Sequence, residues 1–97
     1  MAEGDVCSCA QEFSKLLERV FLALRSISRE DWASSKMELQ DVKKRLKDFE
    51  DCLGTKLGLE QTLKDIEDDV DKGNWTLAMS GFYNFMWQLP LRACKKW

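Results

Sequence analysis

The stretch GNWTLAMSGFYNFMWQLPL, residues 73–91, has no charged side chain, although 33% of the residues in the whole chain are charged. Four polar residues recur in it at every fourth position, namely Thr76, Ser80, Asn84 and Gln88. That period is typical of a stripe along one helix and not of a segment that spans a membrane. The stretch is predicted to form an apolar helix that ends at about Pro90, whose ring removes a hydrogen-bond donor.

The size and composition of the chain indicate a small helical domain. A chain of 97 residues is expected to form one domain, residues 1–97, with a modest core. Its apolar fraction of 44% and net charge of −2 are typical of a soluble, helix-rich protein. One proline and five glycines leave few residues for the many turns of an all-β fold. The expected fold class is therefore all-α.

Three more helices are predicted before the apolar one, each from apolar residues spaced three and four apart. The first is predicted over about 9–27, with Phe13, Leu16, Leu17, Val20, Leu24 and Ile27 as its apolar positions. The second has Trp32, Leu39, Val42, Leu46, Phe49 and Leu53 on one face. The third has Leu59, Leu63, Ile66 and Val70 in one row.

Helix-ending residues separate these segments. Ser28 is predicted to cap the second helix, because an acidic residue follows three positions later. Gly54 occupies the usual place of a glycine after a helix, and Asn74 is a favourable N-cap for the fourth helix. Connections this short make neighbouring helices antiparallel. We therefore expect an antiparallel four-helix bundle of two hairpins, about 9–53 and 55–90, followed by a short basic tail, 91–97.

The two hairpins resemble each other in sequence, with an approximate internal repeat of 43 residues. A shift of that length superposes Cys9 on Cys52, Leu16 on Leu59, Val20 on Leu63, Trp32 on Trp75, Leu39 on Phe82 and Leu46 on Leu89. Any two amphipathic hairpins with similar loops align to some degree. The paired tryptophans and paired cysteines favour a true pseudo-symmetry.

The fourth segment resembles the second helix of a tetratricopeptide repeat, in its glycine, aromatic and alanine opening (Gly73, Trp75, Ala78) and its closing Pro90. The resemblance covers residues 73–90 alone. The preceding helix lacks the tryptophan, leucine–glycine and tyrosine positions of that family, and the spacing here is 43 residues instead of about 34. The resemblance implies a shared helix-hairpin geometry and not membership of the family.

Comparison of the two hairpins divides the fourth helix into two faces. Five residues are predicted to face the core, namely Trp75, Ala78, Phe82, Phe85 and Leu89. Four more apolar residues exceed the one stripe that a bundle needs, namely Met79, Tyr83, Met86 and Trp87. Aromatic residues and methionine are enriched at protein interfaces, so these four are the predicted partner-binding residues. The alternatives are full burial of this helix under the two ends of the chain, or weak binding at a membrane surface.

The four cysteines, Cys7, Cys9, Cys52 and Cys94, are all expected at one end of such a bundle. Three interpretations remain open: inert buried thiols, one or two disulfides that join helix ends, or a tetrathiolate zinc site. The zinc site is the least favoured, because a Cys-x-Cys pair without a second close pair is unusual for zinc. No metal or other cofactor is predicted.

The composition also restricts the classes of function. Histidine is absent, so the chain has no Ser-His-Asp or Cys-His nucleophile system, and we expect no enzyme activity. The predicted function is protein–protein interaction or assembly, as a homodimer or as a small subunit of a larger complex. The first alternative is binding of nucleic acid through basic residues of the second helix and the tail, namely Lys36, Lys43, Lys44, Arg45, Lys47, Arg92, Lys95 and Lys96, with Trp97 beside them. A cysteine-based metal or redox module is the other.

The N-terminal sequence MAEGDVCSCAQEF contains acidic residues and no apolar segment of signal-peptide length. A cytoplasmic location is therefore expected. A mature chain from which a signal had been removed would have the same features.

Overall fold

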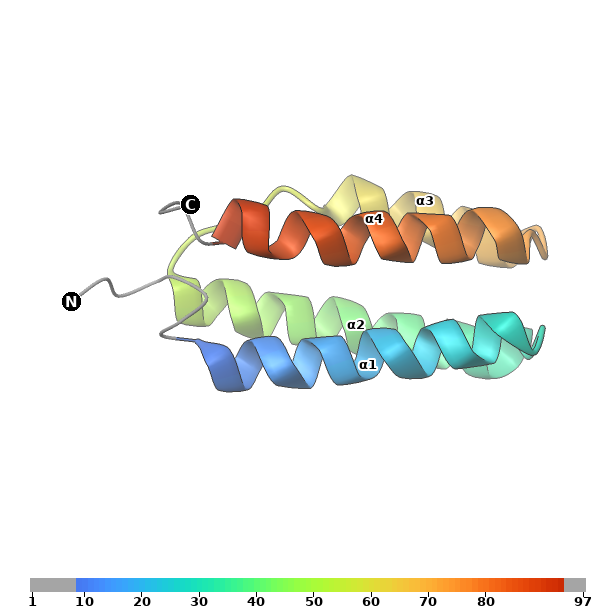
Figure 1. The fold of residues 1–97 in the computed structure, drawn as a ribbon, viewed down its shortest axis with the longest axis horizontal. Coiled ribbons are helices and arrows are strands. Elements are labelled where there is room, and N and C mark those ends of the chain that lie inside the picture. The colour runs from blue at the N-terminus through green and yellow to red at the C-terminus, as the bar shows by residue number, and fades with distance from the viewer. Residues whose placement is uncertain (1–8, 94–97) are drawn as a thin grey trace.

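The computed structural model describes residues 9–93, with side chains described as far as Leu91. Four helices form an elongated bundle of 44 × 18 × 16 Å, and they run alternately up and down (Figure 1). They are α1 (Ala10–Ser28), α2 (Trp32–Leu53), α3 (Glu60–Asp71) and α4 (Trp75–Ala93). The predicted all-α, antiparallel bundle of two similar hairpins is confirmed.

Each helix packs against two others. Within the hairpins α1 contacts α2 and α3 contacts α4, and between the hairpins α1 contacts α4 and α2 contacts α3. The core is a single cluster to which all four helices contribute, and its largest fully buried side chains include Phe49, Phe82 and Phe85. Leu57 and Leu59, from the connection between the hairpins, are buried in the same cluster. The apolar periodicity seen in the sequence therefore faces one shared interior.

The start of α2 differs from the prediction. Ser28 is the last residue of α1, and its hydroxyl donates a hydrogen bond to the Arg25 carbonyl (2.7 Å). The N-cap of α2 is Asp31, whose carboxylate accepts a hydrogen bond from the Ser34 N–H (3.2 Å). The apolar stripe of α1 continues through Ile27, so the helix extends to the serine and does not end before it. An aspartate satisfies a free N–H of the first turn as well as a serine does.

The connections inside the two hairpins have the same hydrogen bonds. After α1, the Glu30 N–H donates to the Ile27 carbonyl (3.0 Å) and the Asp31 N–H to the Ser26 carbonyl (2.9 Å). After α3, the residues 43 positions later repeat both bonds, from Gly73 to Val70 (3.0 Å) and from Asn74 to Asp69 (2.9 Å). This pair of bonds is the Schellman motif. The internal repeat therefore extends to the backbone of the turns.

Helix α4 lies close to α3 and continues beyond its proline. A Cβ atom added to Gly81 would be 2.7 Å from Cγ1 of Ile66, so the absence of a side chain allows the two helices to approach. Pro90 lies inside the helix, which ends at Ala93, three residues later than predicted. A proline ring clashes most strongly with the turn before it, and helices with such a proline can continue beyond it.

One predicted core residue is exposed. Ala78, Phe82, Phe85 and Leu89 are fully buried as expected, but Trp75 is 46% exposed. Its counterpart Trp32 packs against the core and has its indole 3.9 Å from the Cβ position of Gly73. At the equivalent position of the first hairpin, Glu30 takes the place of that glycine.

Candidate interaction surface

The four predicted partner-binding residues divide into two pairs. Met79 and Met86 are partly buried and pack against the core, so they form the inner edge of the predicted face. Tyr83 and Trp87 are 55% and 68% exposed. Of the four residues, the two methionines are therefore partly buried, and the two aromatic side chains are exposed to solvent.

The contact of Gly81 with Ile66 defines which side of α4 faces α3. Consecutive helix residues are separated by about 100°, so Tyr83 lies about 200° around the helix from Gly81. Met79 lies the same angle away in the other direction. Both residues are thus on the side of α4 opposite α3. Trp87 follows one turn after Tyr83 and lies about 40° further round the outer surface of the helix.

The neighbouring edge of α1 carries another exposed aromatic residue. Arg19 and Ser26 face α2, because they contact Asp41 (4.0 Å) and Glu38 (2.7 Å) there. Phe21 lies about 200° around the helix from Arg19, on the side toward α4, and is 58% exposed. The sequence analysis did not select Phe21. In the sequence Phe21 is an apolar residue outside the core-facing positions of α1. Only the contact of α1 with α4 shows that it lies near the apolar residues of α4.

Helical geometry places these residues along the outward-facing sides of α1 and α4, two helices that pack against each other. We call this set of residues the α1–α4 seam, and it consists of Leu17 and Phe21 of α1 with Met79, Tyr83, Met86 and Trp87 of α4. Leu17 is partly buried against the core, as the two methionines are. The seam therefore has a half-buried aliphatic base and three exposed aromatic rings.

Charged contacts lie elsewhere on the molecule. Every ion pair among residues 9–91 includes a residue of α2, and the pairs are Arg19–Asp41, Lys36–Asp71, Lys43–Glu67 and Arg45–Asp48. Helix α4 has no charged residue before Arg92. Among the described residues the ion pairs thus gather around α2, and none of them includes a residue of the α1–α4 seam.

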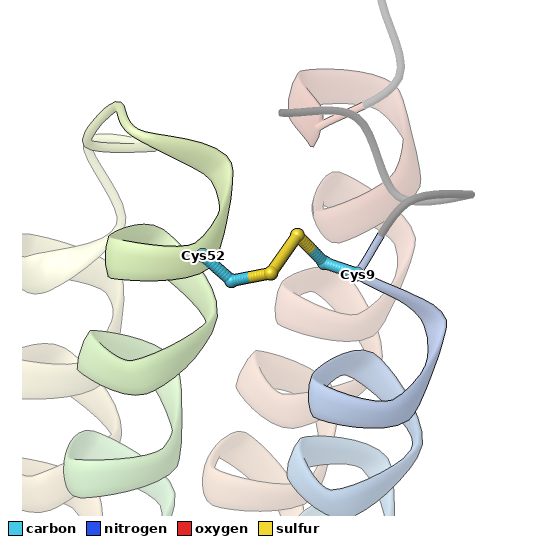
Figure 2. Close-up of a disulfide and its surroundings, with 2 residues drawn as sticks. All are labelled: Cys9 and Cys52. Atoms are coloured by element: carbon cyan, nitrogen blue, oxygen red, sulfur yellow. A yellow bond between two sulfur atoms is a disulfide. The ribbon is translucent and has the colours of Figure 1, made fainter. Parts of the chain in front are cut away.

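Two of the four cysteines form a disulfide. Cys9, just before α1, is bonded to Cys52 in the last turn of α2, and their Cα atoms are 6.1 Å apart (Figure 2). The bond closes the first hairpin at its open end. Cys7 and Cys94 lie outside the described residues. With Cys9 and Cys52 bonded to each other, two of the four thiolates of the zinc interpretation are not available.

The basic residues of α2 are largely paired with acidic ones. Lys43 contacts Glu67 (2.8 Å), Lys36 contacts Asp71 (3.2 Å) and Arg45 contacts Asp48 (3.8 Å). Of the five basic residues of α2 considered for nucleic acid, this leaves Lys44 and Lys47 without a carboxylate partner among the described residues. The basic side chains of the tail are outside that range. Since affinity for nucleic acid depends on free cationic groups, this face is a poor candidate for nucleic-acid binding.

Comparison with known proteins adds no family assignment: no family model, curated protein or solved structure matches this chain. Within the part of the chain that the structure describes, no helix is both long and apolar enough to cross a membrane. The same residues contain no group of three or more cysteine or carboxylate side chains arranged to hold a metal ion. The α1–α4 seam is the candidate site that remains.

Proposed function

We propose that this protein is a non-enzymatic assembly module that pairs with a second copy of itself through the α1–α4 seam. The observation that carries the proposal is the exposure of Phe21, Tyr83 and Trp87 along one strip of the bundle. Aromatic residues in this position are typical of the energetically dominant residues of interfaces. A role without catalysis agrees with the absence of histidine.

A second copy is the favoured partner because of charge and size. In a two-fold dimer a surface meets itself, so a charged surface would repel its copy and an uncharged one does not. A lengthwise face of a bundle 44 Å long and 18 Å wide covers on the order of 800 Å², the area that each partner of a standard interface buries. Only a contact over this whole face would reach that area, so the seam would form the apolar centre of a wider interface.

The proposal is tested by measuring the mass in solution over a range of protein concentration. Cys7→Ser and Cys94→Ser are introduced together, so that intermolecular disulfides do not contribute. We expect a reversible dimer with a dissociation constant in the micromolar range, which corresponds to about −8 kcal/mol. The double variant Tyr83→Lys and Trp87→Lys should remain folded and become monomeric, because both side chains are exposed and charged groups would then face each other.

Met37→Lys provides the matched control. Met37 is 71% exposed on α2, away from the α1–α4 seam, so this variant makes the same kind of change without touching the proposed interface. It should dimerise as the parent does. A parent protein that stays monomeric at high micromolar concentration would contradict self-association. Equal dimerisation of the seam variant would place the contact elsewhere on the molecule.

A further inference from the structure

A hollow lies on the side of the bundle away from the α1–α4 seam, between the second half of α2 and the first turns of α3. Its volume is about 480 Å³, within the range of small-molecule sites. Leu46 and Leu63, both almost fully buried, contribute to its wall, and most of the side chains around them are charged. A smaller hollow, of about 370 Å³, lies at the end of α2; it shares Lys47, Glu50 and Lys56 with the larger one and is also lined by Asp51, which does not line the larger hollow.

The charges that surround this hollow are not balanced. Lys43 and Glu67 neutralise each other at 2.8 Å. Lys47, Lys56 and Lys64 also line the hollow, and none of them has a carboxylate partner among the described residues. Two carboxylates oppose these three ammonium groups: Glu60, and Glu50, which accepts a hydrogen bond from the Leu57 N–H (2.7 Å).

This arrangement leaves an excess of one positive charge beside an apolar wall. Glu50 and Glu60 offset two of the three unpaired lysines, and a bound anion would offset the third. The two buried leucines offer apolar contact to the rest of such a ligand. A ligand that uses both features has one negative group and a hydrocarbon or aromatic body.

We propose that the hollow between α2 and α3 binds a small amphipathic monoanion of the carboxylate class. The negative group lies among Lys47, Lys56 and Lys64, and the apolar body lies against Leu46 and Leu63. This site is separate from the α1–α4 seam and does not depend on self-association. Binding by each copy of a dimer would leave the seam interface unchanged.

The probe for the test is anilinonaphthalene sulfonate, a fluorescent monoanion with an aromatic body, and decanoate serves as the competing carboxylate. The full chain is used with its disulfide intact. We expect the fluorescence of the probe to rise to saturation on binding and to fall again when decanoate displaces the probe. The largest changes in amide chemical shift on binding should be at Leu46, Lys56 and Leu63. Changing the three lysines together (Lys47→Gln, Lys56→Gln, Lys64→Gln) should weaken binding about tenfold or more.

A matched triple variant separates a local site from a general charge effect. Lys15→Gln, Lys44→Gln and Lys72→Gln remove the same total charge from lysines outside the hollow, and should change the affinity less than about twofold. The uncharged analogue phenylnaphthylamine should bind both triple variants alike. Equal weakening by the two triple variants, shifts concentrated at Tyr83 and Trp87, or no displacement by decanoate would each overturn the proposal. The seam variant should bind the probe as the parent does, so this test and the dimerisation test fail independently.

Discussion

Glu30 and Gly73 hold the same left-handed backbone conformation at equivalent turns of the two hairpins, with φ of 55° and 68°. Glycine adopts this region without strain, whereas a residue with a Cβ atom incurs about 1–2 kcal/mol. The first turn therefore keeps a strained glutamate where the second has an unstrained glycine. The hydrogen bonds around both residues are the same, so the difference lies in the side chain alone.

This relationship predicts opposite effects of substitution at the two turns. Glu30→Gly should raise the free energy of unfolding by about 1 kcal/mol, and Gly73→Ala should lower it by about the same amount. Urea unfolding measures both. Glu30→Ala is the control, since it removes the carboxylate and keeps the Cβ atom. If Glu30→Gly were no more stable than Glu30→Ala, the backbone explanation would be wrong.

The close approach of α4 to α3 predicts that Gly81 does not tolerate a methyl group. In an exposed helix Gly→Ala is favourable by up to about 1 kcal/mol, but here the added carbon meets Ile66 at 2.7 Å. We expect Gly81→Ala to destabilise the protein by about 1–3 kcal/mol. Ser80→Ala, on the exposed neighbouring position, should have little effect. A double-mutant cycle with Ile66→Ala should show that the alanine at 81 is better tolerated once the isoleucine is gone.

The disulfide predicts that reduction weakens the fold. Cys9 and Cys52 are 43 residues apart, and a cross-link over that distance stabilises by about 4 kcal/mol in the chain-entropy model. Chemical unfolding with and without reductant should show a loss of this order. The variant Cys7→Ser with Cys94→Ser should keep its sensitivity to reductant. Loss of that sensitivity would mean that another pair of cysteines carries the effect.

This bond also bears on the compartment. Cytosolic thiols are normally kept reduced, whereas disulfides persist in oxidising compartments. The cytoplasmic location expected from the N-terminal sequence and the Cys9–Cys52 bond therefore favour different environments. The two environments can be distinguished by treating native cells with an alkylating reagent and counting the free thiols of the protein. A reduced Cys9 and Cys52 would support the cytoplasm.

A lysine substitution should change the stability of the protein differently at the two pairs of seam residues on α4. Met79 is partly buried against the core, so Met79→Lys should lower stability by about 2 kcal/mol. Tyr83 is more than half exposed, and Tyr83→Lys should stay within about 0.5 kcal/mol of the parent in the dissociated monomer. Thermal unfolding at low concentration measures both. Equal losses would show that the whole strip is buried in the monomer.

The two ion pairs between α2 and α3 should contribute different amounts to the free energy of unfolding, because their side chains differ in exposure. Lys43 and Glu67 are about one-third exposed and 2.8 Å apart, while Lys36 and Asp71 are more than half exposed and 3.2 Å apart. Double-mutant cycles should give about 0.5–1 kcal/mol for the first pair and about 0–0.5 kcal/mol for the second. Added salt should reduce the second more than the first. The reverse order would contradict the role of burial.

Local sequence patterns predicted much of the fold because helices and their ends depend on nearby residues. The period of Leu16, Val20 and Ile27 located α1, and Gly54 and Asn74 marked helix ends as expected. Ser28 was a wrong N-cap because Asp31, three residues later, is an equally good acceptor, and local preference does not distinguish them. Trp75 was placed in the core by analogy with Trp32, but its exposure accompanies a glutamate in a distant turn.

The candidate surface was predicted in part. Tyr83 and Trp87 were selected because the first hairpin carries polar residues, Gln40 and Lys44, at the equivalent positions, which is a comparison within the sequence. Phe21 was missed, because one apolar residue off the core stripe has no meaning until a neighbour is known. The lysines at the hollow were missed for the same reason: Lys47 and Lys64 are on different helices, and only packing places them around one space.

By itself the sequence determined four helices, their approximate ends, a twofold repeat and an uncharged stretch over residues 73–91, since these depend on period, capping and composition over short distances. The tertiary structure alone decided which sides of α1 and α4 meet, that Cys9 bonds to Cys52, and which lysines surround the hollow between α2 and α3. Those features depend on the rotation and depth at which helices pack. Side chains distant in the chain, such as Gly81 and Ile66, set that packing, and no local pattern records it.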